Sequence, residues 1–299
     1  MEFNNILRPS VGADVSRTPP MYRPSVDSPL SRFIRLSLLL CILIFPLASC
    51  DLLPSVTISI TPATSSSNRT QLNVWNRVAT GVEVRYEDWK IPGSDDDTVT
   101  IVRFDIHKIK LSIGYQPKQP LLMSEWMQQE HAIAMINGGY FDPQFKATAL
   151  VISNGNVFGE SYTGFGGMLS ADAHGTVSLR SLRQQPYNPN TEQLQQATQS
   201  SPMLMLGGKR TQFNADASQT RRSVVAMDKQ GRLLFIASPD QVFSLDQLAD
   251  QLASSDLSIE TALNLDGGAS TGLYVNGGSS HVAIDSLAKL PLVVIVRAR

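Results

Sequence analysis

One short segment concentrates side chains that can do chemistry. Asn264 and Asp266 stand two residues apart at the end of an apolar run, so in a strand they share one face. Gly267 and Gly268 follow, and glycines at a turn leave backbone N–H groups exposed; Ser270 comes next. Carboxylates serve as acids, bases and nucleophiles. The alternative is an ordinary turn in which the acid only caps its own backbone.

Three further segments pair glycines or arginines with strand-like runs. They are Asn137-Gly-Gly-Tyr-Phe-Asp142, Ser201–Leu204 with Gly207–Arg210, and Thr220–Ala226, which contains Arg221 and Arg222. An arginine guanidinium matches phosphate oxygens in a bidentate way. Taken singly, such segments are more typical of tight turns and solvated strand ends than of binding sites.

Taken together and in this order, the four segments resemble the phosphodiester glycosidase family. The resemblance covers roughly residues 130–298. It rests on Asn137–Phe141, Ser201–Leu204, Arg222–Ala226, a helix over 244–254 and Ala262–Ser270, the last being the strongest match. Three positions depart from the family pattern, since Ser223, Ala226 and Ala269 replace other small residues.

The resemblance implies hydrolysis of a sugar joined through its anomeric carbon to a phosphodiester. It implies Asp266 as the catalytic carboxylate, oriented by Asn264, and Arg222 as the phosphate-binding cation. Arg221 is expected on the opposite face of the strand. The substrate-binding residues that it implies carry hydroxyl, amide, carboxylate or backbone N–H groups: Asn137, Gly138, Tyr140, Asp142, Gly267, Gly268 and Ser270. Tyr140 or Phe141 could also pack on a sugar face, although a core position is more typical of Phe141.

The elements that must position these residues are mainly strands. Alternating or apolar runs predict strands over 82–86, 98–106, 109–113, 132–136, 261–265 and 290–296, and hairpins over 150–158, 168–179 and 223–237. Helices are predicted over 122–130, with Ser124 as a possible N-cap, and over 244–254, capped by Ser244. The fold class is therefore α+β: mixed, mostly antiparallel sheets with a few packed helices in a single catalytic domain.

The first 71 residues read as a targeting segment and a tether. Residues 36–47 form an apolar run, which is too short to span a bilayer, and Leu-Ala-Ser-Cys50 follows it. This pattern resembles the lipobox of bacterial lipoproteins, in which Cys50 would be lipidated; a plain signal peptide is the alternative. Residues 51–71 are rich in Ser, Thr and Pro, which is typical of a tether. We therefore expect a lipoprotein-type signal over 1–50, with Met1 or Met21 as the start, a tether over 51–71 and the catalytic domain over 72–299.

Composition and the absence of certain motifs exclude several functional classes of protein. The 299 residues carry a net charge of −1, which disfavours a general nucleic-acid binder, and two cysteines exclude a disulfide framework. Phosphate-loop and zinc-protease motifs are absent and the four histidines lack metal spacing, so we expect no cofactor and no metal. The predicted partners are a glycan or sugar-phosphodiester and, through the lipid anchor, the membrane of the cell envelope.

Two alternatives stay open at this point. One is a non-catalytic lipoprotein that binds a glycan or a phosphate on the same fold. The other is a metal-dependent phosphodiesterase that uses Asp142, Asp266 and Asp285.

Overall fold

The computed structural model describes residues 71–90, 96–214, 217–277 and 280–299. The predicted signal segment, Cys50 and the tether up to residue 70 lie outside these residues. Within the described part, no helix has the length and apolar character needed to cross a bilayer.

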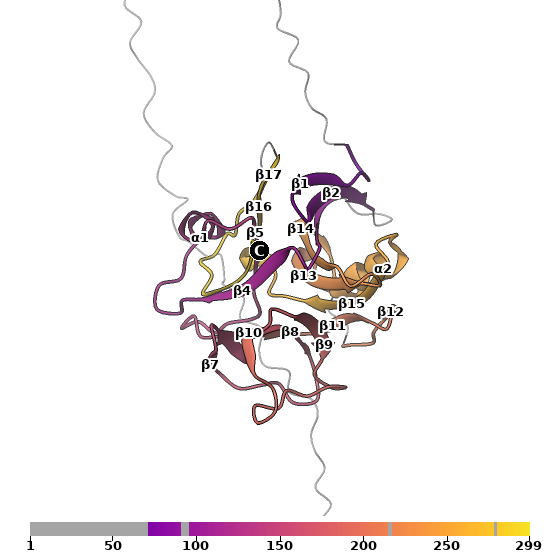
Figure 1. The fold of residues 1–299 in the computed structure, drawn as a ribbon. Coiled ribbons are helices and arrows are strands. Elements are labelled where there is room, and N and C mark those ends of the chain that lie inside the picture. Colours follow the sequence, from indigo (N-terminus) through magenta and orange to yellow (C-terminus); the bar gives the residue numbers. More distant parts are fainter. Residues whose placement is uncertain (1–70, 91–95, 215–216, 278–279) are drawn as a thin grey trace, which may run out of the picture. The chain divides into compact units, whose positions relative to one another are not determined.

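Three antiparallel sheets make up the described domain (Figure 1). From edge to edge, the eight-stranded sheet comprises β1 (Asn76–Ala79), β2 (Val82–Trp89), β3 (Asp97–Phe104), β14 (Leu233–Phe243), β13 (Thr220–Asp228), β15 (Ile259–Asn264), β11 (Met203–Leu206) and β12 (Lys209–Arg210). The second sheet comprises β7 (Asn156–Phe158), β6 (Val151–Ser153), β10 (Leu194–Ser200), β8 (Gly167–Asp172) and β9 (Val177–Ser181). The third comprises β17 (Ser280–Ile284), β16 (Leu273–Gly277), β5 (Ala134–Asn137), β18 (Leu292–Ala298) and β4 (Ile109–Tyr115).

Apolar side chains from all three sheets meet in one core. Phe104 and Phe235 of the first sheet, Leu169 of the second, and Ile136 and Val294 of the third belong to the same buried cluster. Burial of such side chains is the main favourable term in folding. Because the sheets share this core, they form one domain.

The two α-helices of the described residues each cover one sheet. Helix α2 (Leu245–Ser254) buries Leu245, Leu248 and Leu252 against the eight-stranded sheet. Its predicted N-cap is confirmed, since the Ser244 hydroxyl accepts a hydrogen bond from the Gln247 N–H. Helix α1 (Met123–Glu130) packs Trp126 against the third sheet.

Two features differ from the sequence-based expectation. The class is mostly β rather than α+β, because the stretches that showed no clear alternation, such as 194–200 and 203–206, also form strands. Ser124 is not the N-cap of α1: that position is Leu122, and the Asp285 carboxylate accepts the Ser124 N–H from a distant loop. A residue brought in from elsewhere in the chain thus does what a local cap would have done.

Candidate active site

The candidate site lies where strands of two different sheets end. β15 ends at Asn264 and β5 ends at Asn137, and the Asp266 N–H donates to the Gly138 carbonyl at 3.1 Å. Along β13, Val224 pairs with Asn264, and the Leu265 N–H donates to the Ser223 carbonyl. Extending this register by one residue places Arg222 level with Asp266. Predicted residues from motifs that are far apart in the sequence therefore come together at one point of the fold.

Asn137 holds the two glycine turns together. Its Nδ2 donates to the Asp266 carbonyl at 2.7 Å, and its Oδ1 accepts the Gly272 N–H at 3.2 Å. The side chain is only 1% exposed. Both ends of the amide are therefore bound to backbone, which makes Asn137 a structural tie in this state of the protein. Its predicted contact with substrate stays a prediction.

The glycines of both motifs allow close approach of the chain to its neighbours. A Cβ on Gly138 would lie 2.4 Å from the Leu292 Cγ, and one on Gly139 would lie 2.1 Å from the Gln199 carbonyl oxygen. A Cβ on Gly267 would lie 2.8 Å from the Arg221 carbonyl oxygen. These separations are too short for any side chain, so glycine is required for the strand ends to meet.

Asp266 is a partly buried acid that binds its proton more tightly than an ordinary aspartate does. Burial raises the pKa of its carboxyl to about 6, although the Ser270 hydroxyl and the Gly267 N–H both favour the charged form. The Gly267 N–H donates to Oδ1 at 3.0 Å. That N–H, predicted to bind substrate, is thus used by the carboxylate, while Gly268 follows with a positive φ of 62°. Asp266 changes charge near pH 6, as an acid or base at work near neutrality must.

Tyr140 and Asn264 form a hydrogen-bonded group beside Asp266. The Asn264 Nδ2 donates to the Tyr140 Oη at 2.7 Å, and the Tyr140 hydroxyl donates to the Ser201 carbonyl at 2.9 Å. Nδ2 also contacts the Ser201 carbonyl at 3.1 Å. Asn264 therefore positions Tyr140, which differs from the prediction that it orients Asp266. Burial and the charge of Asp266 raise the pKa of the Tyr140 phenol, and Arg222 acts in the opposite direction.

One atom of this group is left without a partner. The Oδ1 of Asn264 is buried, and no described residue donates a hydrogen bond to it. A buried acceptor without a donor costs about 1–3 kcal/mol. A hydroxyl of a bound ligand, or a water molecule, would satisfy it.

The two consecutive arginines serve different parts of the molecule. Arg222 donates from Nε to the Phe243 carbonyl at 3.0 Å and from Nη2 to the Ser218 carbonyl at 2.6 Å. Its charge also acts on Tyr140. Arg221 instead donates to the carbonyls of Pro239 and Asp285, and burial lowers its pKa. The difference agrees with opposite faces of β13, as predicted.

Asp142 has a local role in the structure. Its Oδ1 accepts the N–H groups of Gln144 and Lys146, each at 2.9 Å, and so closes its own turn. Asp285 similarly accepts the N–H groups of Ser124 and Ser286. Across the described ranges, no three His, Cys, Asp or Glu side chains lie close enough to share a metal ion. Asp142, Asp266 and Asp285 therefore do not form the cluster that the metal-dependent alternative required.

Sequence reasoning missed Tyr162 and Gln199, which lie next to the site. The Thr148 hydroxyl donates to the Tyr140 carbonyl at 3.2 Å and lies 3.3 Å from the Tyr162 Oη. The Gln199 side chain accepts the Tyr162 N–H at 2.8 Å. The signal for Tyr162 was its place in a glycine-rich loop, Gly-Glu-Ser-Tyr-Thr-Gly-Phe-Gly, between two predicted strands.

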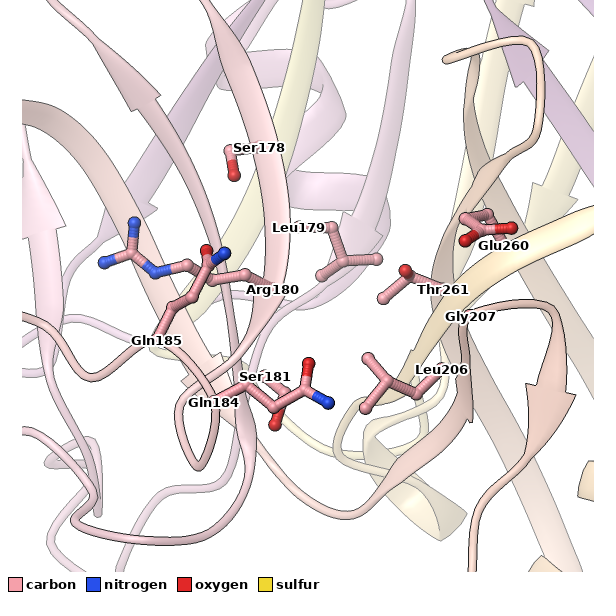
Figure 2. A pocket seen from close by; sticks show the side chains of 10 residues that line it. All are labelled: Ser178, Leu179, Arg180, Ser181, Gln184, Gln185, Leu206, Gly207, Glu260 and Thr261. Carbon is pink, nitrogen blue, oxygen red and sulfur yellow. The ribbon is translucent and has the colours of Figure 1, made fainter.

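A separate polar cavity of about 390 Å³ lies between β9 and the start of β15 (Figure 2). Its lining residues are Ser178, Leu179, Arg180, Ser181, Gln184, Gln185, Leu206, Gly207, Glu260 and Thr261. None of them is a predicted site residue. Asp266 follows the other end of β15, so the chemistry of the motif residues is not placed in this cavity.

Comparison with solved structures identifies the fold. The catalytic domain of zebrafish N-acetylglucosamine-1-phosphodiester alpha-N-acetylglucosaminidase, auto-inhibited by its pro-peptide, superposes with a TM-score of 0.60 at 18% identity, over 77% of this chain and 87% of that one. A hypothetical protein from Synechocystis superposes with a TM-score of 0.55 at 15% identity, over 74% of this chain and 63% of that one. At these identities the likeness concerns the fold alone.

Sequence comparison defines the family. No curated protein matches the chain. The family model described as phosphodiester glycosidase matches residues 130–296, which include the Asn137 turn, the Arg222 strand and the Asp266 turn. This match spans more than half of the chain and confirms the resemblance drawn from the motifs. The chain belongs to the phosphodiester glycosidase family.

Proposed function

We propose that this protein hydrolyses a sugar-1-phosphodiester linkage. The observation that carries the proposal is the position of Asp266: a carboxyl with a pKa raised to about 6, level with Arg222 and beside Tyr140 and Asn264. Family membership supports a hydrolase that acts on phosphodiester-linked sugars. The zebrafish enzyme of similar fold is named for an activity of the same class.

In the proposed reaction, water adds across the bond between the anomeric carbon and the phosphate oxygen. The carbon–oxygen bond breaks through an oxocarbenium-like state, the phosphate leaves as a monoester, and the water oxygen ends on the sugar. Above pH 6 the Asp266 carboxylate is ionised, so it can accept the proton of the attacking water or attack the carbon itself. A phosphate is a good leaving group, so the reaction does not depend on a strong general acid.

Arg222 is proposed to stabilise the charge on the leaving phosphate. Arg222 is 5% exposed and lies on β13, which pairs with β15, and a cation stabilises developing negative charge more strongly where water is excluded. Of the other predicted binding residues, Asn137, Gly138, Tyr140, Gly267 and Ser270 lie against Asp266, and Gly268 continues its turn. Asp142 closes its own turn instead. The unpartnered Asn264 Oδ1 is a further acceptor for a sugar hydroxyl.

The test is turnover of a minimal probe, the methyl phosphodiester of N-acetylglucosamine 1-phosphate, by the purified full chain. We expect release of free sugar, a loss of at least about a thousandfold in kcat for Asp266→Asn, and a loss of about tenfold or more in kcat/KM for Arg222→Lys. Asp142→Asn is the matched control, because it removes a carboxylate that only closes its own turn. If the wild type binds the probe without cleaving it, and Asp266→Asn still binds, the protein is the non-catalytic glycan-binding lipoprotein.

We also propose that the domain acts in the cell envelope, tethered through lipidated Cys50. The apolar run over 36–47 followed by Leu-Ala-Ser-Cys supports this. Labelled fatty acid should be incorporated by the wild type and not by Cys50→Ser, which should leave the membrane fraction. Incorporation by the variant would assign the leader to another kind of signal.

A further inference from the structure

We infer that Phe165 and Tyr162 form a platform that binds the pyranose ring next to the one held at Asp266. This inference rests on the proposed function, because it assigns the same site an additional sugar position. The two rings lie 4.5 Å apart between centroids with an angle of 27° between their planes, so they are stacked. Phe165 is 45% exposed, which leaves much of its ring open to solvent.

The loop that carries the platform is fixed to the site on several sides. Tyr162 is held at its backbone by the Gln199 side chain, whose amide also donates to the Ser161 hydroxyl at 2.8 Å. The backbone of Gln199 in turn lies against Gly139. Gly166 has a φ of 73°, and a Cβ there would lie 2.6 Å from the Ser200 carbonyl oxygen. The platform is therefore anchored on the same residues that line the candidate site.

The platform is linked through Thr148 to the residues beside Asp266. Thr148 bridges the Tyr140 carbonyl and the Tyr162 hydroxyl, and Phe165 stacks on the Tyr162 ring. Phe165 is thus connected to Tyr140 through Thr148 and Tyr162, and the Tyr140 hydroxyl in turn accepts a hydrogen bond from Asn264. A sugar at Asp266 would occupy the inner position, so the exposed ring is available to its neighbour.

The chemistry of the platform fits a sugar face. A flat aromatic surface packs against the C–H groups of a pyranose, and a ring already held in place loses little conformational freedom on binding. The aromatic residues predicted to pack on a sugar are occupied in the protein: Phe141 stacks at 5.8 Å on Phe145, and the Tyr140 hydroxyl is bonded on both sides. Phe165 is the exposed aromatic that the loop presents beside the site.

The experiment compares Phe165→Ala and Phe165→Trp with Phe158→Ala in the full chain. Phe158 is the matched control: it is 41% exposed and lies 5.0 Å from Tyr115, outside the platform. Three probes are used: the minimal methyl phosphodiester, and two versions extended by one N-acetylglucosamine ring, either on the glycosyl side or on the alcohol side. We expect Phe165→Ala to raise KM about three- to tenfold for at least one extended probe, with kcat within twofold and the minimal probe unaffected. Phe165→Trp should retain the wild-type KM.

An unchanged KM for both extended probes, or an equal rise for all three, would overturn the platform. Direct binding of the extended probes separates this result from a failure of the proposed hydrolysis. If no probe is cleaved, loss of binding in Phe165→Ala but not in Phe158→Ala or Asp266→Asn still supports the platform. Equal binding by all variants contradicts it.

Discussion

Asp97, which is fully buried, and Asp266, which is partly buried, are two acids with similarly raised pKa values in two different settings. Burial raises the pKa of each carboxyl to about 6, and each accepts a hydrogen bond from a serine hydroxyl, Ser270 for Asp266 and Ser238 for Asp97. Asp97 is the first residue of the strand β3 and has no exposed surface. Asp266 instead follows the end of β15, on a glycine turn.

The difference between them lies in what surrounds each acid. Asp97 acts on Arg221 together with Asp240 and Asp285, and Arg221 is tied to backbone carbonyls. Asp266 lies level with Arg222 and beside the Tyr140–Asn264 pair. A raised pKa therefore reports burial alone, and what distinguishes Asp266 is the pair of glycine turns and the motif residues Asn137, Tyr140 and Asn264 around it. Arg221 and Arg222 are neighbours on β13, and Arg221 belongs to the Asp97 region while Arg222 belongs to the Asp266 region.

The largest contrast is expected in turnover. Asp266→Asn should reduce kcat on the minimal probe by at least about a thousandfold, while Asp97→Asn should stay within about threefold of wild type. Steady-state kinetics on the two variants, with circular dichroism to check folding, measures this. Equal losses in two folded variants would erase the distinction between the regions.

The dependence of kcat/KM on pH should reflect the titration of Asp266. If the ionised form of Asp266 is the reactive one, kcat/KM falls about tenfold for each pH unit below 6, which is about a hundredfold by pH 4. The Asp97→Asn variant should show the same fall of kcat/KM below pH 6, because Asp97 does not contact the proposed reacting groups. If the fall of kcat/KM below pH 6 disappears in Asp97→Asn, the acid that titrates is Asp97 and the prediction for Asp266 is wrong.

The smallest contrast concerns stability, where the two acids should behave alike. Each pKa is higher in the folded protein than the ordinary value of 3.8, so the unfolded chain binds fewer protons between pH 3.8 and 6. The free energy of unfolding therefore decreases as pH rises through this window, and the penalty is fully present above pH 6, at about 3 kcal/mol for each acid. Relative to wild type, Asp97→Asn and Asp266→Asn should each gain up to this amount between pH 3 and 7.5. Denaturant unfolding at both pH values measures the gain, and a pH-independent difference would contradict it.

The sequence predicted the elements whose stability is local. The 150–158 hairpin is found as β6 and β7 around Asn154, and α2 begins after Ser244 as expected. Alternation and turn chemistry act between near neighbours, so they are readable from a single sequence. The glycine turns at Asn137 and Asp266 were also recognisable, because glycines at strand ends leave a short pattern, while the roles of their side chains stay predictions.

The features that could not be predicted from the sequence depend on contacts between distant parts of the chain. β10 is rich in Gln, Thr and Ser, and it is buried because Gln196 accepts the Ile113 N–H while Gln199 accepts the Tyr162 N–H. No local pattern reveals such a polar strand. The tie from Asn137 to Asp266 joins residues 129 apart, and the partner of Asn264 proved to be Tyr140 rather than its near neighbour. Spacing along the chain shows which side chains share a face, and only the fold shows which ones touch.

The position of β18 has a consequence for synthesis. This late strand lies between β5 and β4, and the Leu292 carbonyl accepts the N–H of Gly138, the first glycine of the Asn137 turn. A growing chain that has not yet reached residue 292 has made Asn137, Arg222 and Asp266, but it lacks the strand on which the Asn137 turn rests. Assembly of the candidate site is therefore deferred until the strand that contains residue 292 has been translated, and a chain that stops earlier carries these side chains without the strand that supports the Asn137 turn.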